Sequence, residues 1–277
     1  MAWIYDTFDV MHPGEGNRAV VTGKPIELGG SLGRDEATAR GCLYATEQLL
    51  THDLVQGLDS VRGATVVIQG CGNAGGTALR LYHEAGAKVI AISDSSGGIY
   101  SKNGLDPESV LDFKRDHGTV VGVPDTTTIT NEELLATECD ILIPAAMENQ
   151  VREDNAGDIR AKLVVEAANG PTTPRADSIL DANGVIVLPD ICANAGGVVV
   201  SYFEWVQNLE NQQWALDKVN DRLRERMIRA TDTIVACWRE IRVEKRAPHG
   251  RPTLRDAALV TAVRRLAKVT MQRDIWM

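Results

Sequence analysis

A glycine-rich loop between an apolar run and an amphipathic helix constrains the fold of this chain more than any other feature. Residues 65–68 form a β-branched run, Gly70, Gly72 and Gly75 follow with the spacing G-x-G-x-x-G, and a helical pattern covers residues 77–85. In such a loop the first glycine permits a tight turn, the second lets the backbone approach a pyrophosphate, and the third lets the helix pack closely on the strand. The start of the helix offers free N–H groups and a partial positive charge to an anion. The loop therefore predicts the phosphate-binding turn of a dinucleotide-binding fold.

An acidic residue follows the next apolar run at the distance that such a fold needs. Residues 88–93 end at Asp94, which lies 19 residues after Gly75 (94 − 75). A carboxylate at this place can accept hydrogen bonds from the hydroxyls of an adenosine ribose. The alternative is a glycine-rich turn in which Asp94 only caps a loop. The order of strand, loop, helix, strand and acid favours dinucleotide binding.

The fold class follows from short apolar runs that alternate with helical patterns. The runs are residues 65–68, 88–92, 140–143, 163–165 and 185–188. Apolar runs without alternation predict strands that are covered on both faces, and strands alternating with helices predict a parallel sheet. After Val200 the strand signals stop, and residues 205–244 and 253–271 have helical patterns, broken around Pro248, Gly250 and Pro252. We expect an α/β fold, a doubly wound Rossmann-type parallel sheet with a C-terminal helical section.

The same patterns divide the chain into three parts. Residues 1–33 are rich in glycine and weakly periodic, so we expect a connecting segment left from a substrate domain. A helical pattern begins near Asp35, a plausible N-cap residue. Residues 34–200 are expected to form the dinucleotide-binding domain, and residues 201–277 a helical section that packs on it.

Charge and hydropathy argue against nucleic-acid and membrane partners. The chain has 29 Lys and Arg against 38 Asp and Glu, a net charge of −9, whereas phosphate backbones require clustered basic residues. The basic residues of 222–246 and 251–273 alternate with acidic ones, which is typical of a solvated helical face. We find no apolar run of the roughly 18 residues that a membrane helix needs, and the first ten residues do not resemble a secretory signal.

Cysteine and histidine positions do not predict a metal site. The five cysteines are widely spaced, without a C-x-x-C pair, and the five histidines show no metal-ligand spacing. We expect buried free thiols and a reducing, cytoplasmic location.

Seven longer segments resemble glutamate dehydrogenases of the hexameric type, in the glutamate/leucine/phenylalanine/valine dehydrogenase family. They are residues 21–26, 29–38, 67–73, 93–100, 143–146, 166–174 and 194–205. The resemblance covers nearly the whole chain and implies the C-terminal, NAD(P)-binding portion of such an enzyme.

The resemblance also implies roles for individual residues. Those expected at the cofactor are Arg34 and Thr38 near the nicotinamide end, Cys71, Gly72, Asn73 and Ala74 along the pyrophosphate, Asp94 and Ser95 at the adenosine ribose, Ala145 and Ala146 along the nucleotide, and Asn169 and Asn194 at the nicotinamide and its ribose. Ser201 would hydrogen-bond the side-chain carboxylate of a glutamate substrate. Taken singly, each could instead be an ordinary helix-start, turn or loop residue.

The choice between NAD and NADP stays open at this stage. Asp94 would repel a 2′-phosphate, which favours NAD. Ser95, Ser96 and Lys102 are close in sequence and could help a phosphate to bind.

The implied activity is the oxidative deamination of L-glutamate to 2-oxoglutarate and ammonia, with NAD(P)+ as hydride acceptor, in a hexamer. In the family the catalytic lysine and aspartate lie upstream of the Met-Ala-Trp segment, which here begins at Met1. We therefore expect no catalytic residue in these 277 residues and turnover near background unless a separate N-terminal domain chain is present. Lys24, outside the catalytic motif, is expected to be structural or interfacial.

Two other functions remain as alternatives. One is a non-catalytic NAD(P)-binding sensor or regulatory subunit. The other is the equivalent half of a leucine, phenylalanine or valine dehydrogenase, although the context of Ser201 and the segment 29–34 favour glutamate.

Overall fold

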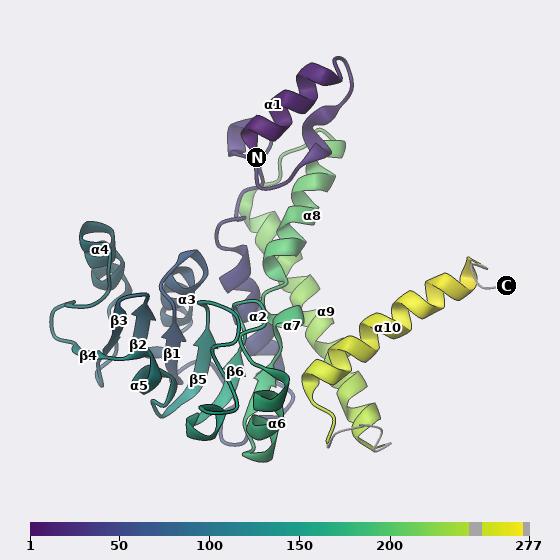
Figure 1. Ribbon diagram of the computed structural model, residues 1–277. Coiled ribbons are helices and arrows are strands. Elements are labelled where there is room, and N and C mark those ends of the chain that lie inside the picture. The colour runs from purple at the N-terminus through teal and green to yellow at the C-terminus, as the bar shows by residue number, and fades with distance from the viewer. Residues whose placement is uncertain (244–250, 274–277) are drawn as a thin grey trace.

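The predicted apolar runs form the parallel part of one seven-stranded sheet. The computed structural model describes residues 1–243 and 251–273 (Figure 1). The strands are β1 (Thr65–Gln69), β2 (Lys88–Asp94), β3 (Gly97–Tyr100), β4 (Thr127–Ile129), β5 (Cys139–Pro144), β6 (Ala161–Val165) and β7 (Ile186–Leu188). Their order in the sheet is β4-β3-β2-β1-β5-β6-β7. β1 pairs in parallel with both β2 and β5, so the winding reverses there, and ligands of such sheets bind at this switch point.

Two strands of the sheet are antiparallel, where a wholly parallel sheet was expected. β3 returns beside β2 with Asp94 opposite Gly97, and β4 pairs with β3 at the sheet edge. Gly97, with φ of 143°, makes the tight return possible. Neither strand carries a continuous apolar run, so the pattern that revealed the other five strands was missing here.

Both faces of the sheet are covered by helices, as the doubly wound prediction requires. The helices α2 (Ala37–Leu50), α3 (Asn73–Glu84), α8 (Gly196–Leu209) and α9 (Leu216–Val243) contribute to one core, and α5 (Asn131–Leu135) and α6 (Pro174–Ala182) to the other. Alternate residues of β1 enter different cores, with Val66 and Ile68 on the first side and Val67 on the second.

The helical ends differ from the sequence patterns in two places, and a third place is not described. α2 begins at Ala37 with Glu36 at the N-cap position, so Asp35 is not the cap. Residues 34–36 form a turn, and the Asp35 carbonyl accepts from the side-chain amide of Asn73. The run 205–244 is not one helix, because α8 ends at Leu209 and Asn211 turns the chain with φ of 51°. The expected break at Pro248 and Gly250 lies outside the described residues, and α10 (Leu254–Gln272) follows it.

The first 33 residues contain more regular structure than their glycines suggested. α1 (Ala2–Met11) is followed by the short 3₁₀ helices η1 (Asn17–Val20) and η2 (Ile26–Leu28), and this segment lies against α8 (Figure 1). The remaining elements are α4 (Pro107–His117), α7 (Asp190–Ala193) and the 3₁₀ turn η3 (Ala156–Asp158). Of the helices in the described part of the chain, none is both long and apolar enough to cross a membrane.

Candidate functional site

Two of the three glycines of the loop after β1 must be glycine for steric reasons within the described structure, and the third need not be. Gly70 has φ of 94°, and a Cβ there would lie 3.0 Å from the Ala145 carbonyl and from the Ala146 Cα. A Cβ on Gly75 would lie 1.8 Å from the Gly70 carbonyl oxygen. A Cβ on Gly72, by contrast, would meet no described heavy atom within 4 Å. Gly70 and Gly75 are thus required by the fold, whereas the space above Gly72 is open to a ligand.

The start of α3 lies next to this open space. Gly72 is its N-cap residue, so the first N–H groups of the helix have no carbonyl of a preceding turn to bind. The Asn73 amide donates to the Asp35 carbonyl at 3.0 Å, which ties the loop to the segment before α2. The Cys71 side chain is buried in the core, and burial raises the pKa of its thiol to about 11. Cys71 can therefore contribute its backbone, together with that of Ala74, to an anion site.

Asp94, at the carboxyl end of β2, is held by four donors. Its Oδ1 accepts from the Ser96 N–H at 2.8 Å and from the Thr119 hydroxyl at 3.3 Å. Its Oδ2 accepts from the Val120 N–H at 2.8 Å and from the Lys114 ammonium at 3.1 Å. Burial alone would raise the pKa of Asp94, but the two backbone donors and Lys114 outweigh it and hold the pKa below its ordinary value. The carboxylate is therefore ionised at neutral pH and fixed at the strand end.

Of the residues expected to help a 2′-phosphate to bind, Lys102 does not lie near Asp94. β3 runs back along β2 with Tyr100 opposite Ala91. In the loop after β3, the Leu105 N–H donates to the Val89 carbonyl. Lys102 therefore lies at the amino end of β2, a strand length away from Asp94. Ser95 and Ser96 do lie in the exposed turn after Asp94, and the cation beside that turn is Lys114 of α4, which sequence spacing did not reveal.

The loops after β5, β6 and β7 complete the carboxyl edge of the sheet. The N–H groups of Ala167 and Ala168 both donate to the Pro144 carbonyl, which joins the ends of β6 and β5. Asn194 follows α7, and its amide donates to the Asn169 side-chain oxygen at 2.7 Å. The two asparagines expected at the nicotinamide end are thus brought together, although they are 25 residues apart in sequence.

Arg34 and Thr38, expected near the nicotinamide end, and Ser201, expected at the substrate, also lie together. Arg34 donates from Nε to the Ser201 hydroxyl at 3.0 Å. A Cβ on Gly197 would lie 2.8 Å from the Thr38 hydroxyl and 3.5 Å from an Arg34 guanidinium nitrogen. Arg34, Thr38 and Ser201 therefore form one polar group where α2 and α8 cross.

Lys24 lies close to this group but is fully buried. Its ammonium pairs with Glu204 at 2.6 Å, with both side chains fully enclosed, and also donates to the Val21 carbonyl. Glu204 accepts in addition from the Gly23 and Lys24 N–H groups. This geometry agrees with the expected structural role of Lys24.

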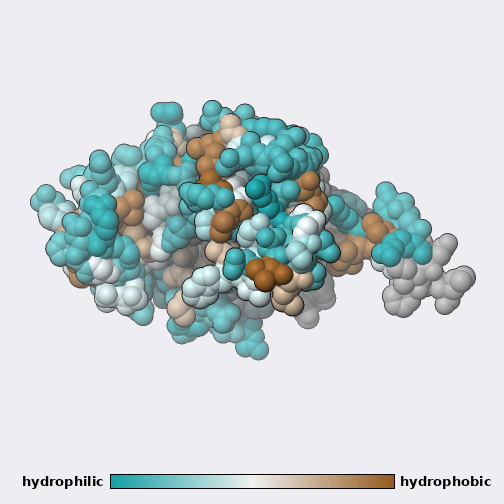
Figure 2. Space-filling view, turned by 90° about the horizontal axis from the view of Figure 1, so that it is seen from above, coloured by the Kyte–Doolittle hydropathy of each residue, from teal (hydrophilic) through white to brown (hydrophobic). Residues whose placement is uncertain are grey.

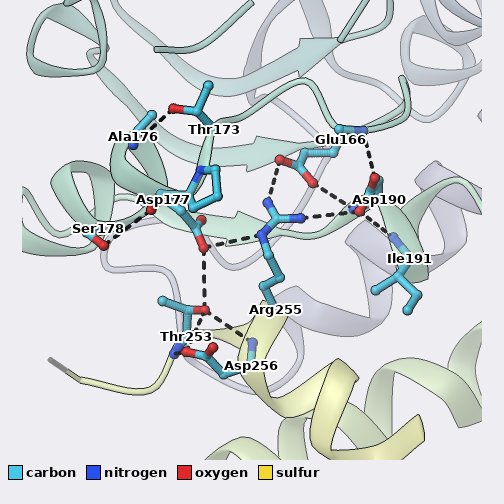
Figure 3. A network of polar contacts seen from close by, with 12 residues as sticks. Glu166, Thr173, Ala176, Asp177, Ser178, Asp190, Ile191, Thr253, Arg255 and Asp256 are labelled. Atoms are coloured by element: carbon cyan, nitrogen blue, oxygen red, sulfur yellow. Dashed lines mark hydrogen bonds and ion pairs between the residues drawn. The ribbon is translucent and has the colours of Figure 1, made fainter. Parts of the chain in front are cut away.

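A further group of charges, which the sequence did not indicate, lies behind the asparagine loops. Arg255 of α10 contacts Glu166, Asp177 and Asp190, which belong to three separate segments of the α/β part (Figure 3). No local pattern could have joined residues that lie 65 to 89 positions apart in sequence.

Comparison with known proteins identifies the family. A sequence model of the glutamate/leucine/phenylalanine/valine dehydrogenases matches residues 29–274. This chain belongs to that family. The match includes the glycine loop, the asparagine loops and the crossing of α2 with α8.

Relatives of this family member are longer than the chain. The glutamate dehydrogenase of Thermotoga maritima is 47% identical over 277 residues, which are 100% of this chain and 63% of the relative. An NAD-specific glutamate dehydrogenase of Staphylococcus aureus is 43% identical over 273 residues, covering 99% of this chain and 62% of the relative. The chain therefore spans somewhat less than two thirds of these relatives.

Solved structures of the family share the fold. The hetero-hexameric glutamate dehydrogenase of Thermus thermophilus, in a leucine-bound form, superposes with a TM-score of 0.87 at 36% identity, covering 100% of this chain and 62% of that one. The enzyme of Peptoniphilus asaccharolyticus superposes with a TM-score of 0.82 at 30% identity, covering 99% and 62%. The Rossmann-type prediction is confirmed.

Proposed function

We propose that this chain is the dinucleotide-binding part of a glutamate dehydrogenase that oxidises L-glutamate to 2-oxoglutarate and ammonia. The observation that carries the proposal is the continuous site along the carboxyl edge of the sheet. It runs from Asp94 through the glycine loop to the asparagine pair and ends at Arg34 and Ser201. The names of the longer relatives support the same activity.

The residues fit a dinucleotide, which would act as hydride acceptor when bound. The open space above Gly72 and the start of α3 suit the pyrophosphate, because an exposed helix N-terminus favours negative charge. Asp94 and Ser95 would then face the adenosine ribose, with Ala145 and Ala146 along the nucleotide. Asn169 and Asn194 would orient the carboxamide and ribose of the nicotinamide, since side-chain amides both donate and accept.

Glutamate is favoured over an apolar amino acid because the substrate end of the site is polar. The Ser201 hydroxyl already accepts from Arg34 at 3.0 Å, so its proton is free to be donated to a carboxylate. The nearby guanidinium offers the complementary charge. A leucine, phenylalanine or valine side chain would leave these groups without partners, which is costly once they are desolvated.

In the proposed enzyme, another part of the protein would cover an exposed apolar face of α8. Val198, Tyr202, Trp205 and Leu209 follow one another at helical spacing beside Ser201, and all four are exposed. Figure 2, which looks onto the α1 side of the molecule, shows hydrophobic residues gathered between hydrophilic ones on that side. We propose that the part of the relatives' length beyond this chain packs near α8, and that the assembled enzyme is an oligomer. The five buried free cysteines suit a reducing cytoplasm.

Activity can be tested in a chimaera that joins the amino-terminal portion of the Thermotoga relative to this chain. The expected result is NADH formation that depends on glutamate, and Ser201→Ala should raise the KM for glutamate by about tenfold, because one hydrogen bond to a charged group is lost. NAD+ binding without turnover of any amino acid would instead favour the non-catalytic sensor. Turnover with leucine or valine but not glutamate would favour the other branch of the family.

Coenzyme preference is expected to depend on Asp94. The parent chain should bind NAD+ more tightly than NADP+, and Asp94→Ser should move the ratio of the two dissociation constants toward NADP+ by about tenfold. The variant removes the ionised carboxylate that repels a 2′-phosphate and frees Lys114, its present ion-pair partner. Isothermal titration of both nucleotides measures the ratio.

Lys114→Met provides the matched control for this shift. Added to Asp94→Ser, it should remove most of the gain in NADP+ affinity, because the freed ammonium is then absent. A ratio that stays constant across parent and both variants would show that Asp94 does not face the ribose.

A further inference from the structure

One guanidinium joins three carboxylates between α10 and the sheet. Arg255, in the first turn of α10, donates to Glu166 at 2.6 Å, to Asp190 at 3.2 Å and to Asp177 at 3.3 Å (Figure 3). The Glu166 side chain is fully buried and that of Arg255 is 22% exposed. A buried charge must be paired to be tolerated, so this contact is costly to break.

Two of the three carboxylates lie at the roots of the asparagine loops. Glu166 directly follows β6 and begins the loop that carries Asn169, while Asp190 opens α7, after which Asn194 follows. The second oxygen of Glu166 accepts from the Asp190 N–H at 2.8 Å. The second oxygen of Asp190 accepts from the Gly170 N–H at 2.8 Å. The network therefore links the two loops to each other as well as to α10.

The tips of the loops depend on the same alignment. The Asn194 amide contacts the Asn169 oxygen at 2.7 Å and the carbonyls of Ala167 and Ala168 at 3.4 and 3.3 Å. If the roots of the two loops slid past one another, these contacts could not all form.

An arginine is required at this position by geometry as well as by charge. Its Nε, Nη1 and Nη2 each address a different carboxylate, and a planar guanidinium holds these donors in a fixed fork. A lysine carries the same charge on one flexible nitrogen. Burial raises the pKa of both Glu166 and Asp177, and the arginine opposes this rise.

We infer that Arg255 is a positioning residue of the dinucleotide site, which holds the loops of Asn169 and Asn194 in register through Glu166 and Asp190. The inference rests on the proposed function, because it assumes that these asparagines meet the nicotinamide end of a bound dinucleotide. The C-terminal helix α10 thereby contributes to cofactor binding without touching the cofactor.

The test compares NAD+ with ADP, which carries the adenosine and pyrophosphate but not the nicotinamide or its ribose. Arg255→Lys and Asp190→Asn are each expected to weaken NAD+ binding by about tenfold relative to ADP, measured by isothermal titration on the full chain. A merely structural defect would weaken both nucleotides alike. Circular dichroism and the thermal midpoint establish that each variant is folded, and Asp190→Asn keeps the test available if Arg255→Lys does not fold.

Asp177→Asn is the matched control. It alters the same network and keeps an oxygen for Arg255, but it lies within α6, after the loop of Asn169 has ended. The NAD+ to ADP ratio should change by less than about twofold in this variant. An unchanged ratio in Arg255→Lys and Asp190→Asn, or an equal shift in Asp177→Asn, would overturn the inference. If the parent bound neither nucleotide, the proposed function itself would fall, and this inference with it.

Discussion

Gly72→Val is expected to abolish dinucleotide binding and leave the fold intact. Gly72 has φ of −87° and ψ of −159°, an extended conformation outside the left-handed region that favours glycine. Its Cβ would meet no heavy atom of residues 1–243 or 251–273 within 4 Å, so the free protein has room for it. The same room is where a pyrophosphate must approach the first N–H groups of α3. We expect the dissociation constant for NAD+ to rise at least about 100-fold, equivalent to roughly 3 kcal/mol, in isothermal titration.

Two other glycines serve as controls for this result. Gly157→Val introduces the same side chain on η3, where a Cβ would meet no described heavy atom within 4 Å. This variant should leave NAD+ affinity unchanged. Gly75→Ala should instead prevent folding, because its Cβ would lie 1.8 Å from the Gly70 carbonyl oxygen. Normal NAD+ binding by folded Gly72→Val would show that the pyrophosphate does not lie above this loop.

Lys24→Met is expected to lower the free energy of unfolding by about 3–5 kcal/mol, the usual result of removing one partner of a buried ion pair. The Lys24 ammonium and the Glu204 carboxylate are both fully enclosed and 2.6 Å apart. Without the ammonium, Glu204 keeps the backbone donors of Gly23 and Lys24 but has no opposite charge. Urea denaturation followed by circular dichroism measures the loss.

The double variant Lys24→Met, Glu204→Gln separates the charge from the packing. It removes both charges and retains one oxygen, which can accept from the Gly23 N–H, so a large part of the lost stability should return. Arg229→Met, which breaks the exposed pair with Glu225, should change stability by no more than about 1 kcal/mol. A loss below about 1 kcal/mol in Lys24→Met would mean that water reaches Glu204.

The parallel strands could be predicted because each is a continuous apolar run between helices. β3 and β4 could not, since Gly97 and Gly98 of β3 gain their strand conformation from pairing with β2, and the threonines of β4 gain theirs from pairing with β3. The division between α8 and α9 depends on the Gln207 side chain, which accepts from the Trp214 N–H across the turn. A helical periodicity alone does not reveal such a contact.

The places of candidate site residues in the fold could be predicted where the pattern is local. The glycine spacing and the acid after β2 belong to one strand–helix–strand unit, so their order was informative without the fold. Lys114 and Arg255 were missed because their partners lie 20 and up to 89 positions away. Lys102 was misplaced because the hairpin reverses the chain after Asp94, so that closeness in sequence became separation in space.

The crossing of α2 with α8 has a consequence for biosynthesis. Arg34 meets Ser201 across 167 positions, and the backbones of α2 and α8 pack so closely that a Cβ on Gly196 would lie 2.0 Å from the Ala37 carbonyl oxygen. At typical translation rates, roughly 10–30 s separate the synthesis of these two segments. During that time the apolar face of α2 cannot pack on α8 or α9, because these helices have not yet been synthesised. The strands that lie between α2 and α8 in the sequence can already pair. The substrate end of the site must therefore be among the last parts to form in a nascent chain, and contacts of such long sequence separation form slowly.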